Sequence, residues 1–220
     1  MTQKGLTIGI DIGKRHDPSA FAAAVAEQRE DGNIHFNVPF IKRLPLDMPY
    51  PDQGKQLISW AEAALDRFKH EINKPQQYTH PDIRVDLTGV GDPLIDMIKP
   101  HLEAHFSVVS CRFQHGGSLG RIPEGYNVGK ALFASRLQVL SESGRIHLPD
   151  DPESKQLALE MLDYDIDIDD EGKETYGAIR PGTRDDMVTA LGLACLIDPT
   201  DYTSTCAPVI LRGEATWNRF

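Results

Sequence analysis

Acidic side chains occur at three places in the sequence where their type and spacing could support metal-dependent chemistry. Asp11 lies within the alternating stretch IGIDIG, and Asp86 ends the stretch IRVD just before a glycine-rich turn. Asp185 and Asp186 precede the apolar segment MVTALGLACLI. A carboxylate between isoleucines loses its hydration and needs a partner, which can be a cation. If these carboxylates converge, they repel one another unless divalent cations neutralise them.

Such a cluster has a defined chemistry. Oxygen-only ligation suits Mg²⁺ or Mn²⁺ rather than zinc, and the scattered cysteines and unpaired histidines offer no zinc spacing. Two such ions in a carboxylate site are the equipment for in-line cleavage of a phosphodiester. We therefore predict Asp11, Asp86 and the pair Asp185–Asp186 as metal ligands. Asp186 is preferred to Asp185 as the direct ligand, because Asp185 occupies the N-cap position of a predicted helix.

The periodicity of apolar residues predicts the elements that must position these carboxylates. Three antiparallel strands followed by strands alternating with helices indicate an α/β fold with a mixed sheet. If the first and fourth strands are neighbours, Asp11 approaches Asp86, and the last helix brings the acidic pair to the same point. A polar, glycine-dense segment, 114–127, is predicted to be a loop. The predicted strands are 6–12, 19–27, 33–41, 82–88 and 106–113, with a hairpin of 163–169 and 174–179; the predicted helices are 54–72, 94–105, 128–143, 152–162 and 184–197.

Composition limits the class of protein. A chain of 220 residues with 40% hydrophobic and 25% charged residues is typical of a globular protein with one main domain. We place that domain at 1–199 and a poorly periodic tail at 200–220. The sequence has no run of 18 apolar residues, no signal peptide and no paired cysteines, which predicts an intracellular protein that spans no membrane.

The charge distribution bears on nucleic-acid binding. A net charge of −10 argues against a protein that coats nucleic acid by bulk attraction. Basic residues nevertheless gather between 112 and 147, around the glycine-rich segment. Within this basic segment, Arg121 and Lys130 are the predicted contacts to a DNA backbone.

Five motifs in order resemble a known family, the nuclease domain of the large terminase subunit of tailed bacteriophages. They are GIDIGKRHDPSAFA, VDLTGVGDPLIDMI, YNVGKALFASRLQVLSESGRIHLP, LALEMLDYDIDIDDEGKETYGA and RDDMVTALGLA, and together they cover roughly residues 6–197. The resemblance implies a ribonuclease-H-like fold. Its mixed central sheet has antiparallel first three strands and then parallel strands, is flanked by helices and carries an extra β-hairpin.

The resemblance also implies an activity, a metal-dependent endonuclease that cuts concatemeric double-stranded viral DNA during packaging with two Mg²⁺ or Mn²⁺ ions. The metal ligands of the family fall on Asp11, Asp86 and the pair Asp185–Asp186. Asp17 matches a further acid just after the first strand, and Lys130 matches a basic residue of the NV-x-K segment. Arg184 is a departure, since many relatives have His there.

The family implies partners that the chain does not contain. Terminase large subunits carry an ATPase motor before the nuclease, but the sequence has no G-x-x-x-x-G-K-[ST] loop, and EGYNVGKA fails that pattern. We therefore expect an excised C-terminal domain of a longer chain. Its expected partners are double-stranded DNA, that motor domain, the portal protein and the small terminase subunit, in the cytoplasm of the bacterial host.

Three other readings remain open at this stage. A Holliday-junction-resolvase-like nuclease would share the fold and cut branched DNA specifically. A non-catalytic docking domain for the portal would bind no metal and would not nick plasmid. The segment IGIDIG also resembles the phosphate-binding first strand of sugar kinases and actin-like ATPases, which need two such domains, and nucleotide binding by calorimetry would identify that class.

Overall fold

A computed structural model describes residues 4–13, 17–72, 79–88, 92–168, 174–178 and 182–197 of the chain. Its centre is an eight-stranded sheet in the order β6-β7-β5-β4-β1-β2-β3-β8. The strands are β1 (Lys4–Asp11), β2 (Ala20–Gln28), β3 (Ile34–Arg43), β4 (Asp82–Asp86), β5 (Ser107–Gln114), β6 (Leu119–Ile122), β7 (Gly125–Gly129) and β8 (Ile146–His147). The helices are α1 (Tyr50–Glu71), α2 (Asp92–Leu102), α3 (Lys130–Glu142), α4 (Pro152–Asp163) and α5 (Asp186–Ala194).

The topology is the mixed sheet that the sequence predicts. β1, β2 and β3 are antiparallel neighbours, while β4 and β5 continue the sheet parallel to β1. The Asp31-Gly32 turn joins β2 to β3, with Gly32 at φ 81°, a conformation that glycine adopts without cost. Two short additions that the sequence analysis missed widen the sheet: β8 pairs with β3, and β6 pairs with β7.

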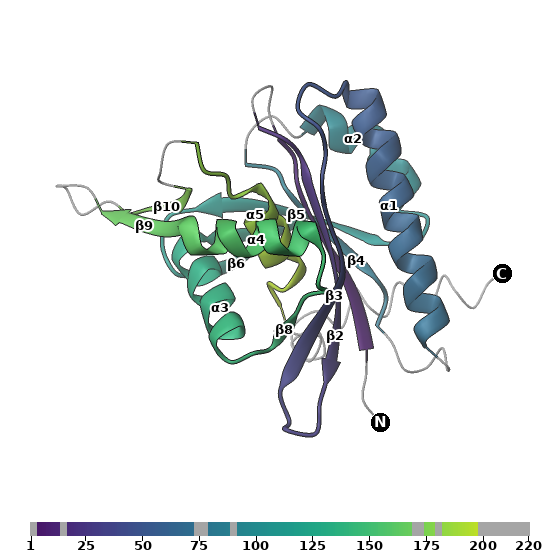
Figure 1. The fold of residues 1–220 in the computed structure, drawn as a ribbon. Coiled ribbons are helices and arrows are strands. Elements are labelled where there is room, and N and C mark those ends of the chain that lie inside the picture. The colour runs from purple at the N-terminus through teal and green to yellow at the C-terminus, as the bar shows by residue number, and fades with distance from the viewer. Residues whose placement is uncertain are drawn as a thin grey trace.

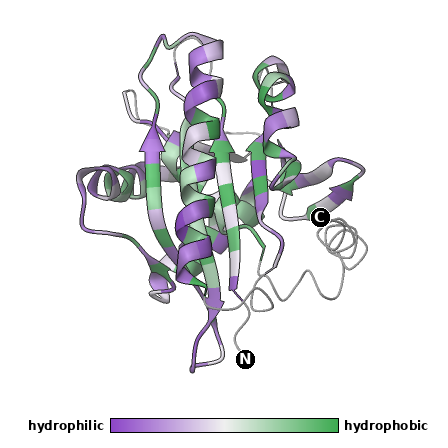
Figure 2. Ribbon diagram, turned by 90° about the vertical axis from the view of Figure 1, so that its right-hand side faces the viewer, coloured by the Kyte–Doolittle hydropathy of each residue, from purple (hydrophilic) through white to green (hydrophobic). Residues whose placement is uncertain are grey.

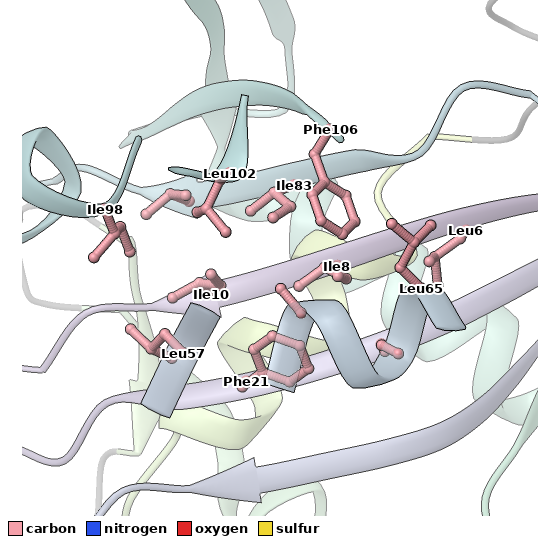
Figure 3. Packing of buried hydrophobic residues seen from close by; sticks show 14 of the residues in the cluster. Leu6, Ile8, Ile10, Phe21, Leu57, Leu65, Ile83, Ile98, Leu102 and Phe106 are labelled. Atoms are coloured by element: carbon pink, nitrogen blue, oxygen red, sulfur yellow. The ribbon is translucent and has the colours of Figure 1, made fainter. Parts of the chain in front are cut away.

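Helices cover both faces of the sheet (Figure 1). α1 and α2 lie on one side, and α3, α4 and α5 lie on the other. The first face is a conventional apolar core, because Ile8 and Ile10 alternate along β1 and meet Leu57 and Leu65 of α1 (Figure 3). Figure 2, which turns α1 toward the viewer, shows hydrophobic bands on the strands behind a helix that is largely hydrophilic on its outer side.

The second face is built for close approach of α5. Gly9, Ala22 and Ala24 belong to the face that α5 crosses, and the alanines there are fully buried. A Cβ on Gly9 would lie 1.9 Å from the carbonyl oxygen of Ala190 and 2.7 Å from the amide nitrogen of Ala194, both in α5. Small residues on β1 and β2 therefore allow the α5 backbone to pack directly on the strands.

The glycine-rich segment 114–127 is only in part the loop that the sequence analysis predicts. Its residues form β6, most of β7 and a two-residue turn between Ile122 and Gly125. The glycines serve two purposes. Gly116, at φ 96°, and Gly117 lie in the non-strand stretch 115–118, as a turn-based reading expects, whereas a Cβ on Gly125 would lie 1.9 Å from the Ser110 carbonyl oxygen. The loop prediction therefore holds for 115–118 and fails for β6 and β7.

The remaining predicted elements are present with shifted ends. The predicted hairpin is β9 (Tyr164–Ile168) paired antiparallel with β10 (Glu174–Ala178), and it extends away from the main sheet in Figure 1. α1 begins at Tyr50 rather than at 54, with Pro51 in its first turn. The predicted tail, 200–220, lies outside the described residues. Among the helices that are described, none has the length and apolar character needed to cross a membrane.

Candidate functional site

The first two predicted carboxylates are direct neighbours in the sheet. Asp11 is the last residue of β1, Asp86 is the last residue of β4, and the parallel register pairs one with the other. Adjacent strands lie about 4.8 Å apart, and paired residues present their side chains on the same face. The condition set by the sequence, that the first and fourth strands be neighbours, is therefore met.

α5 adds the acidic pair at the same edge. Asp11 follows Gly9 by two residues, so its side chain lies on the face of β1 that α5 crosses. Gly9 meets α5 at Ala190 and Ala194, and Asp186 lies one helical turn before Ala190. The helix therefore runs its N-terminus toward the end of β1, where Asp11 lies.

The electrostatics of Asp11 reflect the other acids near it. Burial raises the pKa of Asp11 well above its usual value, and the charges of Asp86, Asp186 and Asp185 raise it further, with a smaller contribution from Asp17. The described residues supply no hydrogen bond or ion pair to the Asp11 carboxylate. Asp11 is thus a partly buried acid, and the described charges with the largest effect on its pKa are those of other acids.

The other carboxylates are held through specific oxygens. Asp86 Oδ1 accepts a hydrogen bond from the backbone N–H of Thr88, at 2.7 Å, in the turn after β4. Asp185 is the N-cap residue of α5, yet its side chain makes no capping bond to the helix. Its Oδ2 instead accepts from the N–H of Ala178 in β10, at 3.2 Å, which links the acidic pair to the hairpin.

Sequence reasoning missed two charged residues of this site. Arg43, the last residue of β3, donates through Nε to Asp186 Oδ2 and through Nη2 to Glu160 Oε1 of α4. Burial disfavours the charge of Arg43, but its contacts with Glu160 and Asp186 outweigh burial and raise its pKa. Burial raises the pKa of Glu160 and of Asp186, and Arg43 opposes both shifts.

The sequence alone does not indicate that Arg43 belongs to the site; the strand register does. Ala20 pairs with Asp11 on one side and with Arg43 on the other, so these residues lie in one row across the sheet. Glu160 is buried on a helix whose other buried positions include Leu157. A single acid at a helical core position has no periodic signature, and nothing in the sequence connects it to Arg43.

The donor set is chemically suited to Mg²⁺ or Mn²⁺, since the described groups that most affect the charge of Asp11 are carboxylates. Arg43 takes only Oδ2 of Asp186, and Ala178 takes only Oδ2 of Asp185. In the described part of the chain, however, no three acidic, histidine or cysteine side chains are already arranged around a common point as a metal site. The residues fit the ion by type and charge, and their side chains would have to draw together to bind it.

Asp17, the predicted auxiliary acid, is exposed and lies close enough to add to the field at Asp11. Its segment is tied back to β1, because the Gly13 N–H donates to Ser19 Oγ at 3.0 Å. Ser19 Oγ in turn donates to Gln53 Oε1 of α1 at 2.8 Å. These buried contacts hold Gly13 and Ser19, the residues on either side of Asp17 in the sequence, close to α1.

The two predicted DNA contacts lie on adjoining elements, Arg121 on β6 and Lys130 directly after β7. Lys130 begins α3, directly after β7, which runs parallel to β5 and β4, so it lies at the same edge of the sheet as Asp86. Arg121 lies on β6 and lines a cavity of about 560 Å³ with His80, Asp82 and Tyr126. The cavity reaches the amino ends of β4 and β5. Arg121 itself lies in the same row of the sheet as Asp86, three strands away, because it pairs with Tyr126, and Cys111 pairs with both Tyr126 and Asp86.

Comparison with known proteins identifies the fold. No family model and no curated protein matches the sequence. The chain is similar in structure to the large terminase nuclease of the thermophilic phage G20c with bound cobalt, at 21% identity and a TM-score of 0.57, covering 87% of this chain and 80% of that one. The same nuclease with bound magnesium gives 23% identity and a TM-score of 0.54, with the same coverage of both chains.

A second relative comes from an animal virus. The human cytomegalovirus terminase nuclease domain, Mn soaked and with an inhibitor bound, is 16% identical with a TM-score of 0.52, over 89% of this chain and 83% of that one. The fold is therefore the ribonuclease-H-like fold of terminase nucleases, as the sequence resemblance predicts.

Proposed function

We propose that this chain is a divalent-metal-dependent DNA endonuclease domain. The observation that supports the proposal is the pairing of Asp11 with Asp86 at the ends of adjacent strands, where the charges of Asp185 and Asp186 also act on Asp11. A folded protein accepts such repulsion where a cation relieves it. The similarity to terminase nucleases whose structures contain cobalt or magnesium supports the same assignment.

The proposed ligands are Asp11, Asp86, Asp185 and Asp186, and Asp11, Asp86 and Asp186 are the proposed catalytic carboxylates. Two Mg²⁺ or Mn²⁺ ions bound there would activate a water molecule and stabilise the leaving oxygen of an in-line displacement. The protein supplies two strand ends and a helix N-terminus that carry the carboxylates, whose side chains would draw together around the ions. Asp17 is the proposed auxiliary acid, at the exposed rim of the site.

Substrate contact is assigned to the basic segment. Lys130 stands at the same edge as the carboxylates, so it is placed to meet the phosphate backbone of a bound duplex. Arg121, in the same row of the sheet as Asp86 but three strands away, would contact the backbone further along the duplex. With a net charge of −10, the domain should bind duplex weakly and with a steep salt dependence.

The packaging role completes the proposal. The domain would cut concatemeric viral DNA in the cytoplasm of a bacterial host, positioned by the ATPase motor of the full-length chain, by the portal and by the small terminase subunit. A resolvase of the same fold remains the second candidate, because the strand-end carboxylates suit either substrate.

Plasmid cleavage tests the activity. Supercoiled plasmid incubated with the purified domain and Mn²⁺ or Mg²⁺ should be nicked and linearised without strong sequence preference, and EDTA should stop the reaction. Asp11→Ala protein, purified identically, should be inactive, and unchanged cleavage by that variant would refute the proposal. Faster cleavage of a four-way junction than of linear duplex would instead favour the resolvase.

A further inference from the structure

A charged bridge stands between the candidate metal centre and α4. It consists of Arg43, Glu160 and Asp186, and each residue comes from a different element. Asp186 is 5% exposed and Glu160 is 3% exposed, so both carboxylates of the bridge are buried. A buried ion pair of this kind contributes little net stability when compared with apolar packing. Its effect is therefore sought in the geometry of Asp186.

The bridge orients one carboxylate oxygen. Arg43 holds Oδ2 of Asp186 through Nε, while its Nη2 is held by Glu160. The planar guanidinium fixes the directions of both bonds, so the Asp186 carboxylate cannot rotate while the bridge is intact. Besides Arg43, the Asp186 carboxylate accepts a hydrogen bond from its own backbone N–H, and Oδ1 is the oxygen that Arg43 does not hold.

Glu160 also compensates the positive charge of Arg43. A lone guanidinium beside Asp186 would repel a cation bound by that carboxylate. Glu160 offsets this charge, and its second oxygen, Oε2, is buried with no hydrogen-bond partner among the described residues. Glu160 thus neutralises the charge of Arg43, so the negative charge of Asp186 can still attract a cation.

We propose that Arg43 is a positioning residue, which, backed by Glu160, presents Oδ1 of Asp186 to the divalent cation. The inference rests on the proposed function, because it requires a cation at the carboxylate cluster. Hydrogen-bond partners behind a metal ligand orient it, and their loss typically lowers metal affinity by about 10- to 100-fold.

A charge-matched pair of double variants tests the inference. Arg43→Gln with Glu160→Gln removes the bridge with no change in net charge. The control is Lys42→Gln with Glu153→Gln, which removes a 2.5 Å ion pair between the same two elements, β3 and α4, without touching Asp186. Mn²⁺ affinity is measured by isothermal titration calorimetry, with circular dichroism to show that each protein is folded.

The bridge variant should bind Mn²⁺ about 10- to 100-fold more weakly than the wild type, and the control should stay within about twofold. Arg43→Lys, which keeps the charge and both acids but lacks the planar fork, should lose about 10-fold and serves if the double variant does not fold. Wild-type affinity in a folded bridge variant, or in Arg43→Lys, would overturn the inference.

The two proposals fail in different ways. Wild-type protein that binds Mn²⁺, with Asp11→Asn abolishing binding and the bridge variant unaffected, overturns only the role of Arg43. Wild-type protein that binds no Mn²⁺, or binds it equally well after Asp11→Asn, overturns the metal centre and with it the role of Arg43.

Discussion

Replacing Asp11 with Asn should make the metal-free protein more stable while abolishing its activity. Asn keeps the shape of the side chain but removes a buried charge that the other aspartates oppose. The raised pKa of Asp11 reports this opposition, because burial and the charges of Asp86, Asp186 and Asp185 all disfavour the ionised form. The ionised Asp11 that metal binding requires is thus predicted to lower the free energy of unfolding whenever no cation is bound.

The size of the effect follows from the register. Asp86 is the paired residue on the adjacent strand, and two unit charges about 5–6 Å apart interact by about 3 kcal/mol at an effective dielectric constant of about 20. Relaxation of the side chains and partial protonation reduce this value. We expect Asp11→Asn to gain about 1–3 kcal/mol in the free energy of unfolding, or about 2–10 °C in Tm for a domain of this size.

The pH dependence has a definite sign. The folded-state pKa of Asp11 lies above its ordinary value of 3.8, so the unfolded chain releases this proton first as the pH rises. The destabilisation by Asp11 is therefore absent below about pH 4, and it grows until the pH exceeds the folded-state pKa. The gain from Asp11→Asn should be largest at neutral and higher pH.

Urea denaturation in EDTA at pH 4 and pH 8 measures the effect. Asp17→Asn is the matched control, because Asp17 is exposed and contributes least to the pKa shift of Asp11. It should change stability by less than about 0.5 kcal/mol. An Asp11→Asn protein that is no more stable than the wild type at pH 8, or that gains equally at pH 4, would refute the electrostatic reasoning.

Four further predictions use other parts of the structure. Saturating Mn²⁺ should raise the Tm of the wild type, since an ion at about 100 times its Kd adds about 2.7 kcal/mol; an equal rise for Asp86→Asn would place the ion elsewhere. Lys130→Ala should slow plasmid cleavage and reduce its salt dependence, while Mn²⁺ affinity by calorimetry stays unchanged. Gly9→Ala should cost at least about 1–3 kcal/mol in urea denaturation, because its Cβ would lie 1.9 Å from the Ala190 carbonyl oxygen. Burial and the charges of Arg29 and His35 lower the pKa of His147 below its ordinary 6.5. The unfolded chain therefore takes up this proton first as the pH falls, so thermal melts should show a Tm that decreases as the pH drops below about 6.5. The decrease should be smaller for His147→Gln.

The local patterns of the sequence determine much of the fold. Alternation of isoleucine with small or polar residues in IGIDIG predicts β1, and the apolar spacing in 54–72 predicts most of α1, because both depend on neighbouring residues along the chain. The sequence also shows an acid within the first strand, one near the end of the fourth strand and a pair at the start of the last helix. These features predict a carboxylate cluster on the condition that the first and fourth strands are neighbours.

The same rules fail where glycine has more than one use. The segment 114–127 looks like a loop, because glycine density usually marks turns. In the folded chain Gly125 and Gly129 allow neighbouring backbones to approach, so the segment is mostly strand. A sequence does not show which backbone a glycine will face, since that backbone belongs to a distant segment.

Only the tertiary structure decides how the candidate site is assembled. The pairing of Asp11 with Asp86, and of Ala20 with Arg43, depends on hydrogen bonds between strands that are far apart in the sequence. A shift of one residue in either register would move these side chains to the other face of the sheet. Arg43 and Glu160 become part of the site only through that register and the packing of α4, because a single buried ion pair leaves no repeating pattern in the sequence.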